Sequence, residues 1–308
     1  MKIITLTLNP AFDVHCKTEM FSSHKENIVT LTSRETGGKG INISRALNSF
    51  GVENTAIVVI GEENGKEFSD MLCRDSLSFL TVSCEGRIRE NITIHDENKT
   101  ETRISFGGFS ADNSLIDKLK TTIGIPNPDM IITLTGSIPS GIETEKLLAV
   151  LKEYENEGAR IVIDSRSVSL EELIAFKPWL IKPNKDEAEN YLGKRINTPR
   201  DAATAASALF AKGIKNVIIS LGSEGAVIAT REGNWYAKAP RADVLSTIGA
   251  GDSAVAGFID GFLRGLPVSD CLKNAVAFGT AACIREGTAP PLLADVEHFR
   301  DEIAIFRF

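Results

Sequence analysis

A run of small residues late in the chain has the composition of an anion-binding loop. Residues 246–251, Ser-Thr-Ile-Gly-Ala-Gly, precede a stretch in which apolar residues recur at helical spacing. A helix that begins near Gly251 points unpaired backbone N–H groups and the positive end of its dipole toward the loop, and glycines let an anion approach closely. We therefore expect the backbone amides of Gly249, Ala250 and Gly251 to bind a phosphate group.

Asp252 follows this loop directly, and two interpretations of it are open. A carboxylate next to a phosphate is repelled by it, unless the carboxylate accepts the proton of the hydroxyl group that attacks the phosphorus. Asp252 would then be the general base of a phosphoryl transfer. Alternatively, Asp252 only caps its own helix, since Asp is common at helix N-termini.

A second glycine-rich segment, residues 36–45, also leads into a helical pattern. It does not match the dinucleotide-binding fingerprint, because Ile43 stands where the third glycine should be. The P-loop motif is missing as well, because no lysine that follows a glycine precedes a serine or threonine. The segment instead presents backbone amides together with the side chains of Lys39 and Asn42, which suits a ligand with several hydroxyl groups.

A third segment, residues 182–187, has the sequence Lys-Pro-Asn-Lys-Asp-Glu. Asn184 and Glu187 are three residues apart, so at the start of a helix both can face a hydrated divalent cation. The same spacing describes a capping box, in which the two residues only close the helix N-terminus. The segment leaves both interpretations open.

The elements that must position these segments form an α/β pattern. Apolar runs rich in β-branched residues alternate with helical patterns, and their continuous hydrophobicity indicates burial on both faces. The runs are residues 2–8, 55–60, 130–134, 160–163, 180–182 and 216–221. We predict a doubly wound, mostly parallel sheet flanked by helices, whose ligands bind beyond the carboxyl ends of its strands.

Two polar stretches interrupt this pattern, at about residues 11–35 and 87–106. The second reads as a β-hairpin with a turn at 96–99. It has an apolar face of Ile92 and Ile94 and a polar face of Asn91, Thr93 and His95. We expect the two stretches to pair into a small sheet that serves as a lid on a single domain spanning residues 1–308. Two surface hairpins without a function are the alternative.

The composition of the chain limits the kinds of molecule that the protein can be expected to bind. The chain has 308 residues, of which 43% are hydrophobic and 24% charged, and its formal net charge is −7. Acidic charge argues against non-specific binding of nucleic acid, and no apolar run approaches the roughly 20 residues of a membrane helix. Five cysteines without a CxxC pair fit reduced thiols, and the first residues do not resemble a secretion signal. We expect a cytoplasmic protein that binds neither nucleic acid nor membranes.

Taken together and in order, these segments resemble the PfkB (ribokinase-like) family of carbohydrate kinases. Two signatures carry the likeness, residues 37–44 with Gly51 and Gly61, and residues 246–259 around Gly-Ala-Gly-Asp. Shorter matches extend it over essentially the whole chain, at residues 9–13, 136–141, 182–187, 220–225 and 287–288. The resemblance implies a ribokinase-like fold with a small β-sheet lid and the transfer of a phosphoryl group from ATP.

Within the family, residues 5–13 and 37–42 are similar to the hexose-phosphate branch, the 1-phosphofructokinases and tagatose-6-phosphate kinases. The resemblance implies a sugar phosphate as substrate, with fructose 1-phosphate placed first and tagatose 6-phosphate as the alternative. It implies that Asp13, Gly38 and Asn42 hold sugar hydroxyls, with Ser137 in the same site. The cations implied to face the phosphate of the substrate are Lys25, Lys39, Arg89 and Arg103.

The resemblance further implies an ATP site, Mg²⁺ and a homodimer formed through the lid. The residues implied to border the nucleotide are Lys182, Asn184, Ser220, Gly222, Gly225 and Asn274. Asn184 and Glu187 would hold Mg²⁺ through water. Arg166 departs from the family pattern and would alter the pocket if it pointed inward. The rival classes are a nucleotide-dependent dehydrogenase, a non-catalytic sugar-phosphate-binding protein and a kinase of nucleosides or neutral sugars.

Overall fold

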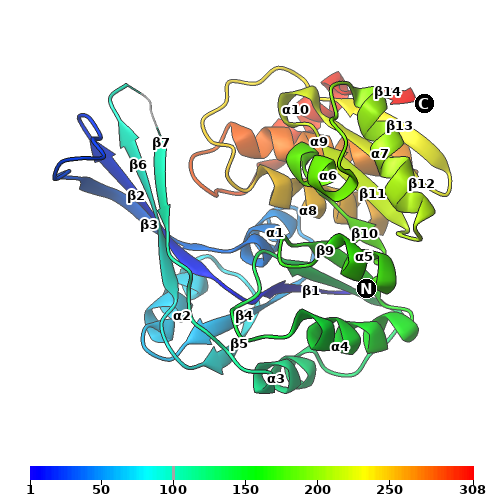
Figure 1. Ribbon diagram of the computed structural model, residues 1–308. Coiled ribbons are helices and arrows are strands. Elements are labelled where there is room, and N and C mark those ends of the chain that lie inside the picture. The colour runs from blue at the N-terminus through cyan, green and yellow to red at the C-terminus, as the bar shows by residue number, and fades with distance from the viewer. Residues whose placement is uncertain (99–100) are drawn as a thin grey trace.

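The computed structural model describes residues 1–98 and 101–308, which form one large and one small β-sheet. Figure 1 shows the small sheet standing away from the main body. The strands of the large sheet lie in the order β14-β13-β12-β11-β10-β9-β8-β1-β4-β5. They are β1 (Lys2–Thr7), β4 (Thr55–Gly61), β5 (Phe79–Cys84), β8 (Met130–Thr135), β9 (Arg160–Asp164), β10 (Leu180–Ile181), β11 (Asn216–Ser220), β12 (Ala226–Thr230), β13 (Gly233–Lys238) and β14 (Ala304–Arg307).

Neighbouring strands from β5 to β11 are parallel, as the continuous apolar runs predicted. Every residue of β8 is buried, because helices cover both faces of the sheet there. The strands β12, β13 and β14 add an antiparallel edge that was not among the expected strands.

The helices form two layers, each with its own apolar core against one face of the large sheet. One layer contains α1 (Lys39–Asn48), α8 (Ala250–Leu263), α9 (Val268–Cys283) and α10 (Leu293–Glu302). The other contains α2 (Gly65–Arg74), α3 (Ser114–Ile123), α4 (Thr144–Asn156), α5 (Leu170–Phe176), α6 (Lys185–Leu192) and α7 (Pro199–Ala211). A short 3₁₀ turn, η1 (Gly222–Glu224), follows β11. The predicted doubly wound α/β class is therefore confirmed.

The small sheet has the strand order β3-β2-β6-β7. Its strands are β2 (Ala11–Thr18), β3 (Thr30–Gly37), β6 (Arg89–Asp96) and β7 (Glu101–Ser105). β2 and β6 come from the two polar stretches of the sequence and pair in parallel, which joins the stretches into one sheet. Of the turn expected at 96–99, Lys99 lies outside the described residues.

The described part of the chain contains no helix of the length and apolarity that crossing a membrane requires.

Candidate active site

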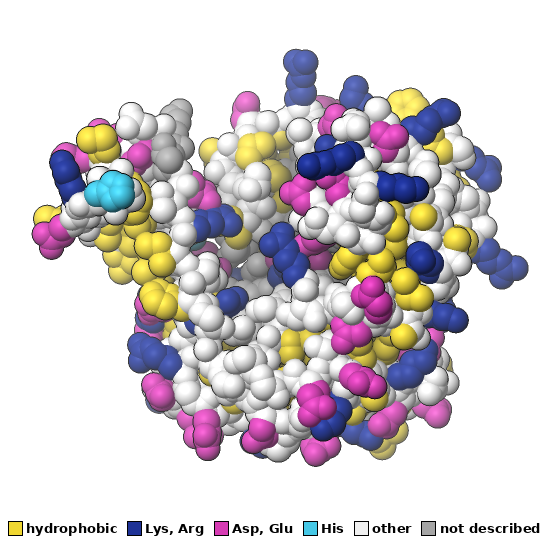
Figure 2. Space-filling view, viewed as in Figure 1, with side chains coloured by type: hydrophobic (Ala, Val, Ile, Leu, Met, Phe, Trp, Pro, Cys, Tyr) yellow, Lys and Arg dark blue, Asp and Glu magenta, His cyan; other side chains and the backbone are white. Residues whose placement is uncertain are grey.

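A cavity of about 690 Å³ lies between the small sheet and the carboxyl ends of the parallel strands. Figure 2 shows this hollow, with Lys and Arg side chains at its walls. Strands β1, β8, β9, β10 and β11 each place a lining residue at or just beyond their carboxyl ends, as the topology of a parallel sheet predicts. The predicted site residues that line it are Asp13, Gly38, Lys39, Asn42, Arg89, Arg103, Ser137, Lys182, Asn184, Glu187, Ser220, Gly249, Gly251 and Asp252.

Five predicted site residues lie outside this lining. Ala250, between the lining residues Gly249 and Gly251, is the first residue of α8. Asn274 is buried and donates hydrogen bonds from Nδ2 to the carbonyl oxygen of Gly257 and to Asp260 Oδ2, so it joins α9 to α8. Gly225 is fixed by packing, because a Cβ there would lie 2.0 Å from the carbonyl oxygen of Ala237. Gly222 begins η1 beyond Ser220, and Lys25 is exposed in the connection between β2 and β3.

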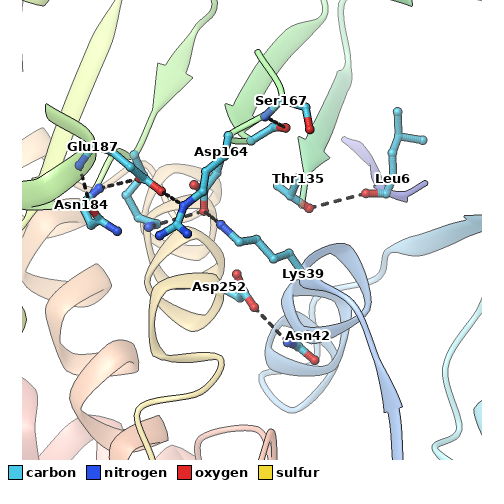
Figure 3. Close-up of polar contacts among 12 residues, drawn as sticks. Leu6, Lys39, Asn42, Thr135, Asp164, Ser167, Asn184, Glu187 and Asp252 are labelled. Atoms are coloured by element: carbon cyan, nitrogen blue, oxygen red, sulfur yellow. Dashed lines mark hydrogen bonds and ion pairs between the residues drawn. The ribbon is translucent and has the colours of Figure 1, made fainter. Parts of the chain in front are cut away.

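The glycine-rich loop meets helix α8 as the sequence predicted. Gly249 is the N-cap and has a φ of 76°, a left-handed conformation that favours glycine, and Ala250 begins the helix. Asp252 lies in the first turn and is buried, and its Oδ2 accepts a hydrogen bond of 2.9 Å from Asn42 Nδ2 (Figure 3). No side chain caps α8, so the interpretation of Asp252 as a helix cap is wrong.

Burial raises the pKa of Asp252 from 3.8 to about 6. Lys39 opposes this shift by its positive charge, whereas the carboxylate of Asp164 adds to it. A carboxylate with a pKa near 6 is largely ionised at neutral pH, yet it is basic enough to take a proton from a reacting group.

A buried ionic cluster lies next to Asp252. Lys39 Nζ is 3.2 Å and Lys182 Nζ is 3.4 Å from Asp164 Oδ2 (Figure 3). Burial favours the neutral form of Asp164, but Lys182 and Lys39 outweigh it and lower its pKa below 3.8. Asp164 directly follows the apolar run 160–163, and the sequence assigned it no role. Its role as the shared counter-ion arises because α1, β9 and the end of β10 meet in space.

The opposite wall of the cavity holds another carboxylate, Asp13 on β2. Burial raises its pKa, and Asn91 Nδ2 donates a 3.0 Å hydrogen bond to its Oδ1. Three cavity-lining residues near it have buried polar atoms with no hydrogen-bond partner in the structure; the atoms are Asn9 Oδ1, Arg89 Nε and Asn91 Oδ1. Because buried polar atoms are rarely left unpaired, this wall fits a polar ligand with several donors and acceptors.

Asn184 and Glu187 form the capping box of α6 that the sequence left as an alternative. Asn184 Oδ1 accepts from the backbone N–H of Glu187, and Glu187 Oε2 accepts from that of Asn184. Glu187 Oε1 accepts a 2.6 Å hydrogen bond from Arg166 Nε, and Arg166 also lines the cavity. Among the described residues, no group of three or more His, Cys, Asp or Glu is placed to hold a metal ion. The two side chains fit a hydrated Mg²⁺ as acceptors of hydrogen bonds from its water ligands.

This arrangement defines an α/β enzyme of the phosphotransferase class: a glycine-rich helix start, a buried carboxylate beside it and a polar, cation-lined cavity. Residues 10–295 match the pfkB family of carbohydrate kinases, and the chain belongs to that family. It is therefore a phosphotransferase with an alcohol group as acceptor.

Curated relatives and solved structures agree with this assignment. The chain is 31% identical to the 1-phosphofructokinase of Escherichia coli (strain K12) over 91% of its own length and 90% of that protein. It is 29% identical to the tagatose-6-phosphate kinase of Staphylococcus epidermidis over 93% of both chains. The crystal structure of phosphofructokinase-2 from Escherichia coli matches with a TM-score of 0.90 and 28% identity, over 98% of this chain and 99% of that one.

Proposed function

We propose that this kinase transfers the γ-phosphoryl group of ATP to a ketohexose monophosphate and yields a 1,6-bisphosphate. Fructose 1-phosphate is the first candidate and tagatose 6-phosphate the second, because curated relatives of both kinds match over at least nine-tenths of the chain. The observation that carries the proposal is the buried carboxylate of Asp252 beside the start of α8, in a cavity that also holds Lys39 and Arg89.

The chemistry follows from the position of Asp252. The acceptor oxygen of the sugar attacks the γ-phosphorus, its proton passes to the Asp252 carboxylate, and the bond to the β,γ-bridging oxygen breaks to release ADP. The backbone N–H groups of Gly249, Ala250 and Gly251 stabilise the charge that develops on the transferred group. Asn42 Nδ2 holds the carboxylate in place through its hydrogen bond.

Mg²⁺, when bound, neutralises charge on the ATP phosphates. Asn184 and Glu187 would hold its water ligands, and Lys182 and Ser220 would border the nucleotide. Lys39 and Lys182 both form ion pairs with Asp164. Burial opposes the charge of Lys39, but the carboxylates of Asp164 and Asp252 outweigh it and raise the pKa of Lys39.

One coupled assay tests the proposed function. ADP release is measured with fructose 1-phosphate, tagatose 6-phosphate and fructose 6-phosphate in turn, at equal concentrations and with Mg²⁺ and ATP. We expect the highest kcat/KM for fructose 1-phosphate. ADP release that no ketohexose phosphate stimulates contradicts the proposal.

We predict that replacing Gly37 by Ala selectively weakens binding of the sugar. A Cβ at this position would lie 2.0 Å from Asp13 Oδ2, so the carboxylate must leave the place it now holds. Loss of a hydrogen bond to a charged group costs about 1.5–3 kcal/mol, so KM for the sugar phosphate should rise about 10–100-fold. KM for ATP should stay unchanged, because Asp13 lies on the sheet opposite the loop before α8.

The matched control for this variant is Gly107→Ala, where a Cβ would have no atom within 4 Å. It should leave both KM values as they are. A Gly37→Ala enzyme with normal KM for every sugar phosphate would remove Asp13 from the substrate site.

We propose that the small sheet serves as a lid over the cavity and as the interface of a homodimer. Its face opposite the cavity exposes large apolar side chains, such as Leu31 (58%) and Ile104 (42%), and Figure 2 shows hydrophobic side chains over this sheet. A solved structure of Escherichia coli phosphofructokinase-2 is described as its tetrameric inhibited form, so assembly occurs among similar proteins.

Light scattering tests this interface. The measured mass should be twice the chain mass of 33.3 kDa, and the Leu31→Glu variant should have the mass of one chain. A monomeric parent protein contradicts the interface.

A further inference from the structure

Arg45 of α1 contacts the residue that holds the proposed base. Asn42 and Arg45 are three residues apart on this helix, so their side chains lie on the same face. Arg45 Nη1 donates a hydrogen bond of 3.4 Å to Asn42 Oδ1. Asn42 Nδ2 in turn donates its 2.9 Å hydrogen bond to Asp252 Oδ2 (Figure 3). Arg45 itself lies outside the cavity lining, so it can act on the reacting groups only through the residues that it contacts.

The two hydrogen bonds of Asn42 fix the direction in which its amide points. The carboxylate of Asp252 only accepts hydrogen bonds, so it requires the NH₂ group of the amide. The guanidinium of Arg45 only donates, so it requires the amide oxygen. A reversed amide would place oxygen against the carboxylate and NH₂ against the guanidinium, and both contacts would be repulsive. Because Asn42 and Asp252 are both buried, these hydrogen bonds are stronger than they would be in water.

The guanidinium of Arg45 is itself held from two other elements. The side chain is only 11% exposed. Its Nε donates a 3.1 Å hydrogen bond to Oδ2 of Asp75, the residue that ends α2, and Nη2 pairs with the same oxygen. Nη1 donates a 2.7 Å hydrogen bond to the carbonyl oxygen of Thr36, and Nη2 bonds the hydroxyl group of Thr36. A planar guanidinium with five N–H groups can make all these bonds at once, whereas a lysine ammonium cannot.

The contact with Thr36 ties Arg45 to the connection between the small sheet and α1. Thr36 is the last residue but one of β3, and Gly37 and Gly38 join it to the helix. Gly38 has a φ of 145°, which favours glycine, and glycines leave a backbone free to move. The bonds of Arg45 span these two glycines, so they fix the guanidinium, and with it the amide of Asn42, relative to both elements.

We propose that Arg45 is a positioning residue for the phosphoryl transfer, which acts through Asn42 to set the carboxylate of Asp252 against the acceptor hydroxyl. The inference rests on the proposed function, in which Asp252 is the base. A displacement of about 1 Å in a reacting group can lower a rate about 100-fold. The loss of Arg45 should therefore lower kcat, whereas KM for ATP should not change.

The test begins with Arg45→Met, which keeps an unbranched apolar stem and removes every donor. We expect kcat with fructose 1-phosphate to fall about 10–100-fold, the range for loss of a hydrogen bond to a charged group. The hydrogen bond from Asn42 lowers the pKa of Asp252, so a loosened amide should move the acid limb of kcat/KM to higher pH, by up to about one unit. The charged groups that face Asp252, namely Lys39, Asp164 and Lys182, remain in all the variants.

Two further variants separate positioning from a merely structural role. Arg45→Lys keeps the charge and one donor group, so it should recover part of kcat, and it replaces the Met variant if that protein does not fold. Arg264→Met is the matched control, because Arg264 Nε pairs with Asp260 at 3.1 Å on α8, outside the cavity lining. This control should lose stability and keep both kcat and the acid limb of the parent.

The decisive comparison repeats Arg45→Met in an Asn42→Ala background. Because Arg45 acts through Asn42, the second substitution should lower kcat far less there than in the parent, and it should not move the acid limb further. The same fold-decrease in both backgrounds would show a structural role and overturn the inference. An Arg45→Met enzyme with the kcat and the acid limb of the parent would overturn it as well.

Urea unfolding distinguishes a failure of this inference from a failure of the proposed function. If no ketohexose phosphate stimulates ADP release by the parent, the proposed function fails. The contact between Arg45 and Asn42 is then judged by stability alone. Either single substitution breaks the same hydrogen bond, so the double variant should lose less unfolding free energy than the sum of the two single variants. Additive losses would overturn the inference, whether or not the protein is active.

Discussion

Replacing Asp252 by Asn is expected to lower kcat by about 10²–10⁴-fold, the usual contribution of a general base. The amide keeps the shape of the side chain and can still accept the hydrogen bond from Asn42, so the cavity is preserved. It cannot take the proton of the attacking hydroxyl. KM for the sugar phosphate should therefore change little.

The same substitution is expected to make the protein more stable at pH 7. Burial raises the pKa of Asp252 from 3.8 to about 6, so the folded state binds this proton more tightly than the unfolded state does. The ionised carboxylate therefore lowers the free energy of unfolding. This loss grows as the pH rises from about 4 to 6 and stays constant above pH 6. At about 1.4 kcal/mol per pKa unit, removing the charge should raise the free energy of unfolding by up to about 3 kcal/mol at pH 7.

The measurements are steady-state kinetics and urea unfolding of both proteins at pH 7 and pH 4. Asp260→Asn is the matched control, because Asp260 is equally buried on α8 but bonds Asn274 and Arg264 outside the cavity lining. That control should lose stability and keep its kcat. An Asp252→Asn enzyme with near-normal kcat would remove the carboxylate from the role of base.

The acid limb of the pH profile should report the same carboxylate. Because the ionised form of Asp252 is the active one, kcat/KM should fall as the pH decreases through about 6. The substrate phosphate also titrates near pH 6. Its effect is identified by repeating the profile with unphosphorylated fructose. A profile for fructose that stays flat to pH 5 would contradict a base with this pKa.

Replacing Asp164 by Asn is expected to destabilise the fold by about 3–5 kcal/mol at pH 7. The change leaves the ammonium of Lys182, which is only 6% exposed, and that of Lys39 next to each other without the carboxylate that pairs with both. Removing one partner of a buried ion pair costs this much because a charge remains unpaired in the interior. Because the pKa of Asp164 is lowered in the folded state, the stabilisation by its ionised carboxylate is complete above pH 3.8. This stabilisation is lost as the pH falls through the lowered pKa.

Urea unfolding at pH 7 measures this loss, and Asp70→Asn provides the comparison. Asp70 pairs with Lys66 on the exposed surface of α2, where an ion pair contributes at most about 0.5 kcal/mol. The Asp164 variant should also shift the acid limb of the activity profile to lower pH, because the charge of Asp164 helps to raise the pKa of Asp252. Equally small decreases in the free energy of unfolding of both variants would show that the buried cluster stabilises the fold no more than a surface ion pair does.

The sequence predicted the segments of the site better than the contacts between them. The glycine-rich loop and Asp252 were identified because a helix start and its dipole are local properties of the chain. Asp164, His15 and Thr93 line the cavity but were given no role, because their surroundings depend on strands and helices that are distant in sequence. Asn274 and Gly225 were placed near the nucleotide by resemblance, whereas in the structure they lie outside the cavity lining and pack elements together.

Local periodicity determined the doubly wound class, the two polar stretches and the start of α8, since each depends on residues within a few positions of one another. Tertiary structure alone decided which charges are paired and which polar atoms remain free. The two polar stretches are separated by more than fifty residues, and only their parallel pairing sets Asp13 beside Asn91 in the cavity. Burial likewise decided the pKa of Asp252, because the loss of water around a carboxylate depends on the packed interior that surrounds it.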